Sequence, residues 1–75
     1  MSSVLTEKQK EAITLRARGF GNKQISEELG ITDSALRQRL KQACDNLGAR
    51  NVLHAVAIAV HLGIISMERE GNDED

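Results

Sequence analysis

Three long polar side chains, Arg37, Gln38 and Lys41, fall on one face of a segment whose residue pattern is helical. The opposite face is apolar, because leucine and alanine recur every three or four positions between residues 36 and 47. In the major groove of DNA, Arg and Lys donate hydrogen bonds to O6 and N7 of guanine, and Gln pairs with adenine. The polar face therefore predicts contacts with DNA bases. A face that is merely solvated is the alternative.

The elements that must position this face are four predicted helices in an all-α fold. The only aromatic residue is one phenylalanine and proline is absent, so the core must be aliphatic, which suits packed helices. Thr6, Asn22, Thr32 and Asn51 are suitable N-cap residues, and a glycine follows each expected helix. The predicted helices run over residues 7–18, 23–29, 33–47 and 52–62.

The second and third predicted helices are separated only by residues 30–32, so they must cross at a steep angle. Ser26 is small where the two helices approach each other, and Gly30 stands where the backbone needs a positive φ. In a helix-turn-helix of this kind the second helix lies in the major groove. Lys23 and Arg39 lie towards its flanks, where DNA phosphates are expected. A helix pair with a purely structural role is the alternative.

Length and composition restrict the class of protein further. Seventy-five residues make one small domain, and Cys44, the only cysteine, allows neither an intrachain disulfide nor a cysteine zinc site. No apolar run is long enough to span a membrane, which points to the cytoplasm. His54 and His61 have no evident third metal ligand, and no catalytic set is apparent. We therefore expect neither an enzyme nor a cofactor or metal site.

Charge is distributed unevenly along the chain. Residues 68–75 carry five acidic residues and one arginine, so residues 1–67 have a net charge of +3 although the whole chain has −1. The sequence predicts one DNA-binding domain over residues 1–67, followed by an acidic tail that we expect to be disordered. A tail that regulates the domain by repelling DNA is the alternative.

Nearly the whole chain resembles the LuxR-type, or GerE-type, helix-turn-helix DNA-binding domain. The resemblance rests on an ordered set of segments: LTEKQKEAI, GFGNKQIS, GITDSALR, LGAR and HAVAIAVHLGII. It implies a four-helix domain that binds double-stranded DNA as a dimer and regulates transcription. By position, it implies base contacts by Arg37, Gln38 and Lys41. It also implies phosphate contacts by Asn22, Lys23, Thr32, Ser34 and Arg39.

Several positions depart from the usual pattern of that family. Gln9 stands where a glutamate is usual, and Asn46 stands where a lysine is common. Arg16 replaces a usual leucine, Glu7 a frequent proline and Arg39 a frequent histidine. We expect these differences to affect the DNA affinity more than the fold.

The fourth predicted helix is apolar on two faces. One stripe, which includes Leu53, suits the core of the domain itself. A second stripe would be exposed in a monomer, and a contiguous apolar patch usually marks an interface. We expect it to form a homodimer contact, as the family resemblance also implies; C-terminal residues that fold back over it are the alternative. The predicted interface residues are Ala55, Ile58, Leu62 and Ile65.

These patterns favour a sequence-specific transcriptional regulator that acts as a homodimer. Two alternatives remain open. Residues 35–47 also fit the promoter-reading region of a sigma factor, although the apolar fourth helix argues against it. The fourth helix could instead pair with another LuxR-type regulator and block it, which would make the chain an antagonist. The sequence also leaves open whether the chain is a small stand-alone regulator or one domain of a longer protein.

Overall fold

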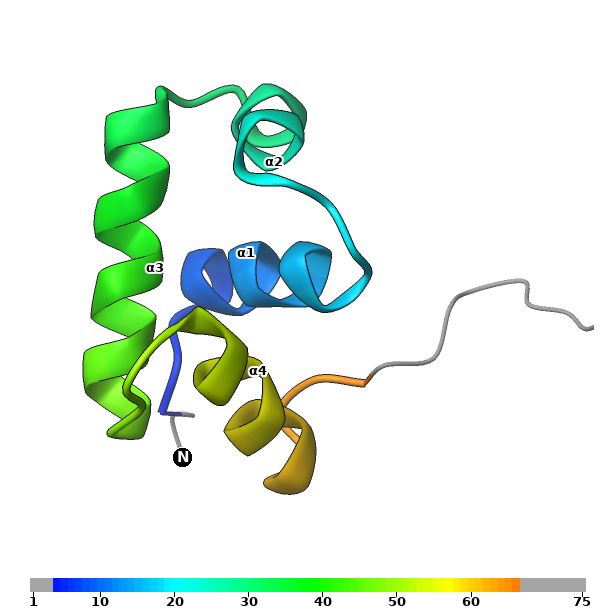
Figure 1. The fold of residues 1–75 in the computed structure, drawn as a ribbon, viewed down its shortest axis with the longest axis vertical. Helices are drawn as coiled ribbons and strands as arrows, with labels where there is room; N and C mark the ends of the chain where they lie inside the picture. Colours follow the sequence, from blue (N-terminus) through cyan, green and yellow to red (C-terminus); the bar gives the residue numbers. More distant parts are fainter. Residues whose placement is uncertain (1–3, 67–75) are drawn as a thin grey trace, which may run out of the picture.

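The computed structural model describes residues 4–66. Within them the chain forms four α-helices and no β-strand, which confirms the all-α prediction (Figure 1). The predicted acidic tail, residues 68–75, lies outside the described residues. Each observed helix end lies within one residue of its predicted position. The helices are α1 (Glu7–Ala17), α2 (Asn22–Leu29), α3 (Asp33–Leu47) and α4 (Val52–His61).

Helix α3 lies along one side of the molecule, and the other three helices pack against it (Figure 1). Helix α1 crosses the middle, between α2 and α4, and contacts both. The predicted apolar seam of α3 is buried at Leu36, Leu40 and Ala43, and so are Ala12 and Ile13 of α1. The three short helices thus cover one face of α3 and leave its other face clear.

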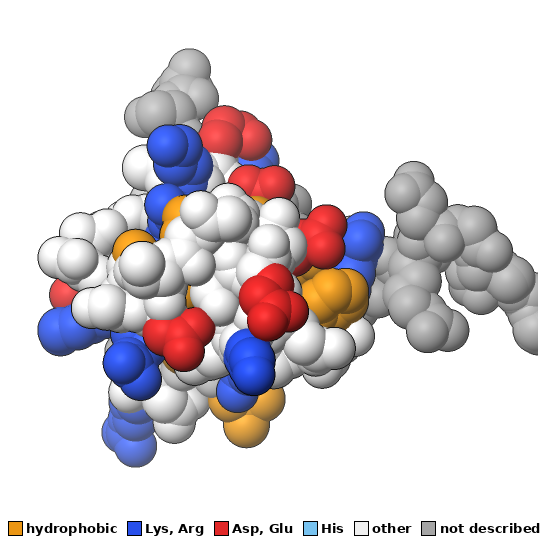
Figure 2. All heavy atoms as spheres, turned by 90° about the horizontal axis from the view of Figure 1, so that it is seen from above, with side chains coloured by type: hydrophobic (Ala, Val, Ile, Leu, Met, Phe, Trp, Pro, Cys, Tyr) orange, Lys and Arg blue, Asp and Glu red, His pale blue; other side chains and the backbone are white. Residues whose placement is uncertain are grey.

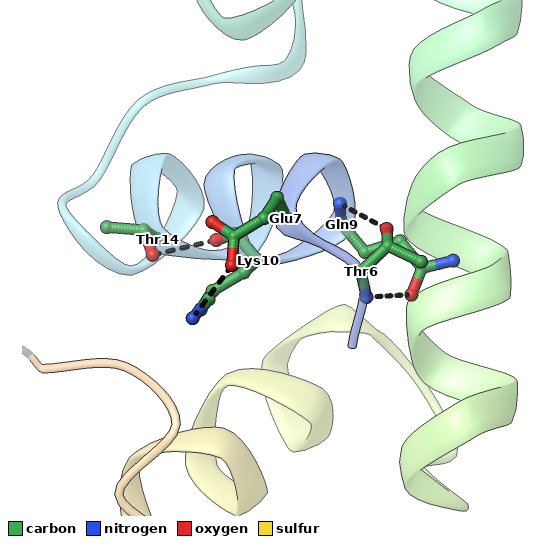
Figure 3. Close-up of polar contacts among 5 residues, drawn as sticks. All are labelled: Thr6, Glu7, Gln9, Lys10 and Thr14. Atoms are coloured by element: carbon green, nitrogen blue, oxygen red, sulfur yellow. Dashed lines mark hydrogen bonds and ion pairs between the residues drawn. The ribbon is translucent and has the colours of Figure 1, made fainter. Parts of the chain in front are cut away.

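A capping box begins α1, as the sequence predicts. The Thr6 hydroxyl oxygen accepts a hydrogen bond from the Gln9 N–H at 3.1 Å, and the Thr6 N–H donates to Gln9 Oε1 at 3.2 Å (Figure 3). Gln9 Oε1 also accepts a hydrogen bond from Nδ2 of Asn46, on α3, at 2.9 Å. Two positions that depart from the LuxR-type pattern therefore meet in a neutral pair that joins α1 to α3.

The start of α2 differs from the prediction. Asn22 is not the N-cap but the first residue of the helix, and Gly21 caps it with an extended backbone. Gln24 Oε1 accepts a hydrogen bond from the Gly21 N–H at 2.9 Å. The Asn22 side chain instead faces α1, where Arg16 Nη1 donates to Asn22 Oδ1 at 3.4 Å. The Asn22 side chain therefore contacts Arg16, which stands at a usual leucine position, and does not cap α2.

The assignment of the two apolar stripes of α4 was wrong at three positions, although Leu62 is exposed as predicted. Ala55 and Ile65, predicted at a dimer interface, are buried in the core of the chain itself, whereas Leu53, predicted in the core, is 80% exposed. Small side chains face inward because α4 packs closely against α1 and α3, so Ala55 and Ala59 occupy the contact. A shallow groove, mostly apolar, remains on one side of α4. It is lined by Leu53, Val56, Ala57, Val60 and His61.

Candidate nucleic-acid interface

The turn between α2 and α3 has the geometry that the sequence predicts. Gly30 has φ +68° and ψ +36°, a left-handed conformation that a side chain disfavours. The Gly30 N–H donates to the Glu27 carbonyl at 3.3 Å, and the Ile31 N–H donates to the Ser26 carbonyl at 2.9 Å. These bonds form a Schellman motif, which ends α2 and directs the chain into α3 within three residues.

A buried hydroxyl fixes the angle between α2 and α3. Ser26 is 4% exposed, and its Oγ donates to Asp33 Oδ1, at the start of α3, at 2.8 Å. The Lys23 carbonyl lies 2.9 Å from the same hydroxyl and is a second acceptor for it. Thr32 caps α3 as predicted, since its Oγ1 accepts from the Ala35 N–H at 3.0 Å. The sequence predicted only the small size of Ser26, because its polar partner comes from the next helix.

The three residues predicted to contact bases lie together on the clear face of α3. Arg37, Gln38 and Lys41 are exposed, and the Arg37 and Gln38 side chains have no hydrogen bond or ion pair within residues 4–66. Lys41 Nζ lies 3.9 Å from Asp45 Oδ2, one turn further along α3. Seen from above, basic side chains project at the edge where α3 lies, on the left of Figure 2. This face presents donors that match the acceptors of guanine.

The residues predicted to hold phosphates surround that face less evenly. Lys23 and Ser34 are exposed, at the start of α2 and in the first turn of α3. Asn22 and Thr32 are exposed too, but their side-chain oxygens already accept hydrogen bonds. Arg39 is half-buried, on the flank of α3. Thr32, Ser34 and Arg39 thus lie at the start of α3 or along it, whereas Asn22 and Lys23 lie at the opposite end of α2 from the turn.

The sequence analysis missed Arg50, which adds a cation to this surface. Arg50 is exposed, precedes the α4 N-cap Asn51, and its guanidinium has no partner within the described residues. Its backbone N–H donates to Nδ1 of His54 at 3.1 Å. A basic residue just before an N-cap was the available signal, but only the fold brings it beside α3. An open hollow of about 360 Å³ between α3 and α4 is lined by residues that include Asn22, Arg37, Lys41, Asp45, Arg50 and Asn51.

Cys44 also lines this hollow, but its side chain is buried. It is 8% exposed, and burial raises the pKa of its thiol, with the Asp45 carboxylate acting in the same direction. Among residues 4–66 no three His, Cys, Asp or Glu side chains gather as a metal site would require. The described helices are also too short or too polar to cross a bilayer.

A helix-turn-helix that holds an exposed basic face over a buried leucine seam defines the class: this is a DNA-binding domain of the kind found in transcription regulators. Residues 1–47 match the family described as Sigma-70, region 4, and the chain belongs to that helix-turn-helix family. The match covers α1, α2 and α3 and ends before α4.

Relatives and a solved structure extend the comparison to α4. The structure of the transcription factor GerE superposes with a TM-score of 0.84 at 27% identity, over 89% of this chain and all of that one. This likeness confirms the resemblance to LuxR-type domains. Transcriptional regulatory protein YdfI of Bacillus subtilis is 33% identical over 85% of this chain. Transcriptional activator protein BjaR1 of Bradyrhizobium diazoefficiens is 37% identical over 87% of it. The chain spans only 30% and 27% of the length of these two proteins.

Proposed function

We propose that this domain is the DNA-binding part of a sequence-specific transcriptional regulator, with α3 in the major groove. The observation that carries the proposal is the exposed face of α3. There Arg37 and Gln38 lack protein partners within residues 4–66, while Leu36 and Leu40 behind them are buried. A regulator of this class works on chromosomal DNA, and we accordingly propose the bacterial cytoplasm as its location.

Two kinds of contact are expected in the complex. Base contacts give the sequence preference, whereas phosphate contacts fix the register of the protein on the duplex. We assign the base contacts to Arg37, Gln38 and Lys41, which are exposed on α3. We assign the phosphate contacts to Asn22, Lys23, Thr32, Ser34 and Arg39.

We further propose that the domain binds as a homodimer through the apolar groove of α4. Leu53 is 80% exposed and lies in that groove with Val56, Ala57 and Val60. Exposed apolar surface of this kind favours a protein contact. Ile58 and Leu62, from the originally predicted interface, lie on another flank of the helix and are not part of the groove. A two-fold dimer would present two copies of α3 to half-sites about 34–36 Å apart.

The test is selection of preferred sites from random duplex DNA, followed by binding measurements at several salt concentrations. The wild type should select a sequence and should lose affinity steeply as salt rises, because phosphate contacts release counterions. Arg37→Ala should weaken binding to the selected site by about 1–3 kcal/mol and relax its preference at one position.

The matched control is Arg18→Ala, which removes the same charge from the end of α1, away from α3 (Figure 1). It should leave the preference unchanged. Equal losses in the two variants would mean that only net charge matters and that the face of α3 is solvated.

Two other candidates are favoured by particular observations. The Sigma-70, region 4 match over residues 1–47 favours a promoter-reading domain, which needs no dimer. The exposed groove of α4 equally suits pairing with another LuxR-type regulator, which would make this chain an antagonist. Sedimentation of the protein with and without its selected site separates the three candidates. A monomer on one half-site supports the sigma-like function, and failure to bind DNA supports the antagonist.

A further inference from the structure

An acidic side chain stands on the otherwise basic face of α3. Arg37, Lys41 and Asp45 are spaced four residues apart and line the same hollow. The Lys41 and Asp45 side chains are 76% and 66% exposed, and Lys41 Nζ lies 3.9 Å from Asp45 Oδ2. Of the residues that line the hollow, only Asp45 is acidic.

The ion pair has little to do for the fold. Pairs this exposed contribute little to stability, because water screens them. On DNA the carboxylate would face a polyanion, so it disfavours binding unless it has a hydrogen-bond donor to accept from. The bases supply such donors only at the amino groups exposed in the major groove. The affinity for DNA should therefore be lower when the base opposite Asp45 presents no amino group in the major groove.

The Lys41–Asp45 pair matches G·C through the side-chain pairings that are usual in the major groove. On the major-groove edge of G·C, guanine presents the acceptors O6 and N7, and cytosine presents the N4 amino donor beside them. Lys41 is a donor and Asp45 is an acceptor, held next to each other by the helical repeat. Lysine is a usual partner of guanine, and aspartate is a usual partner of cytosine N4. A·T also presents an acceptor next to an amino donor, but both lie on adenine, whose usual partners are asparagine and glutamine.

We propose that Asp45 is a specificity-determining residue and that the Lys41–Asp45 pair selects a G·C base pair. Lys41 donates to guanine, and Asp45 accepts from N4 of the paired cytosine. This inference rests on the proposed binding of α3 in the major groove. It adds the identity of one base pair in each half-site and a residue that the family resemblance does not implicate.

The experiment is selection from random duplex DNA by the full chain and four variants: Lys41→Ala, Asp45→Ala, Asp45→Asn and Glu11→Gln. The wild type should select G·C at one position of each half-site. Lys41→Ala and Asp45→Ala should both lose on the order of tenfold of the preference at that same position, and at no other. Asp45→Asn should shift the preference towards adenine, which the asparagine amide pairs with.

Glu11→Gln is the matched control, because it removes one negative charge from an exposed position of α1, away from the hollow. It should leave every preference unchanged. Asp45→Ala should also bind non-selected DNA more tightly than the wild type does, a gain that a damaged fold could not produce.

Two outcomes overturn the inference in distinguishable ways. If the wild type selects a site but the Asp45 variants keep its full preference, or if Glu11→Gln relaxes the same position, then Asp45 does not determine specificity and the proposed function stands. If the wild type selects no sequence at all, the proposed function fails and this inference fails with it.

Discussion

The thiol of Cys44 is a single residue whose environment predicts a measurable pH dependence. Burial raises its pKa, so between the ordinary cysteine pKa of about 8.5 and the raised value the folded chain keeps a proton that the unfolded chain has lost. Its contribution to the free energy of unfolding is therefore fully present below about pH 8.5 and declines as the pH rises.

Urea unfolding of the wild type and Cys44→Ala between pH 7 and pH 10 measures this contribution. The difference in free energy of unfolding between the two proteins should shrink, or turn in favour of the variant, as the pH increases. A difference in free energy of unfolding that stays constant up to pH 10 would show that burial does not raise the pKa of the thiol. The raised pKa also keeps Cys44 protonated and slow to react with alkylating reagents in the native state.

At the scale of elements, the turn at Gly30 controls how α3 is presented. A Cβ at Gly30 would meet no atom within 4 Å, so the cost of Gly30→Ala is the left-handed φ alone. We expect a loss of about 1–2 kcal/mol in the free energy of unfolding, measured in urea. If the turn relaxes to relieve the strain, α3 tilts and the DNA affinity falls more than stability alone explains.

Gly21→Ala is the matched control for that substitution. Gly21 flanks the other end of α2, as its N-cap, and has an ordinary φ of −77°. A Cβ there would lie 3.8 Å from Gln24 Oε1, a normal contact. It should lower the free energy of unfolding by about 0.5–1 kcal/mol, less than Gly30→Ala, because alanine is a poorer N-cap residue than glycine. Equal losses at the two glycines would mean that flexibility lost near α2, rather than the left-handed conformation, causes the effect.

Helices whose ends and faces are marked by nearby residues were predicted well from the sequence. The orientation of a helix with few polar residues was not. Thr6, Thr32 and Asn51 cap their helices as expected, because a cap is a contact over three residues. Helix α3 carries leucines on one face and charged residues on the other, so the sequence predicts which face is exposed. Helix α4 has few polar residues between Val52 and Val60, so its periodicity cannot distinguish inside from outside. Its orientation is set by where α1 and α3 leave room only for alanine.

The candidate site divides along the same line. Arg37, Gln38 and Lys41 follow from one helix and were predicted. The Ser26–Asp33 bond depends on a contact between helices for which a single sequence gives no signal. Arg50 has a weak signal, its place before an N-cap, and only the fold brings it beside α3. Asn22 was predicted as the N-cap of α2 but is its first residue, and its side chain accepts a hydrogen bond from Arg16 of α1.

At the scale of the whole molecule, the exposed groove of α4 predicts how two copies associate. Leu53→Glu should prevent dimer formation, since it places a charge in an apolar contact, yet it should leave the monomer folded because Leu53 is 80% exposed. Sedimentation velocity measures the association, and circular dichroism verifies the fold.

Leu62→Glu is the control, because Leu62 is 56% exposed but lies outside the groove. It should leave the dimer intact. Dissociation by Leu62→Glu, with Leu53→Glu still dimeric, would restore the interface that the sequence first predicted and overturn the one proposed from the groove.

The neutral contact between Gln9 and Asn46 separates two properties that are often coupled in small basic domains. The part-buried polar link between α1 and α3 carries no charge, and the two ion pairs within residues 4–66 each join residues of one helix. Ionic strength should therefore act on DNA binding and hardly on folding. A rise in salt should accordingly release the protein from a column of immobilised heparin in its native form.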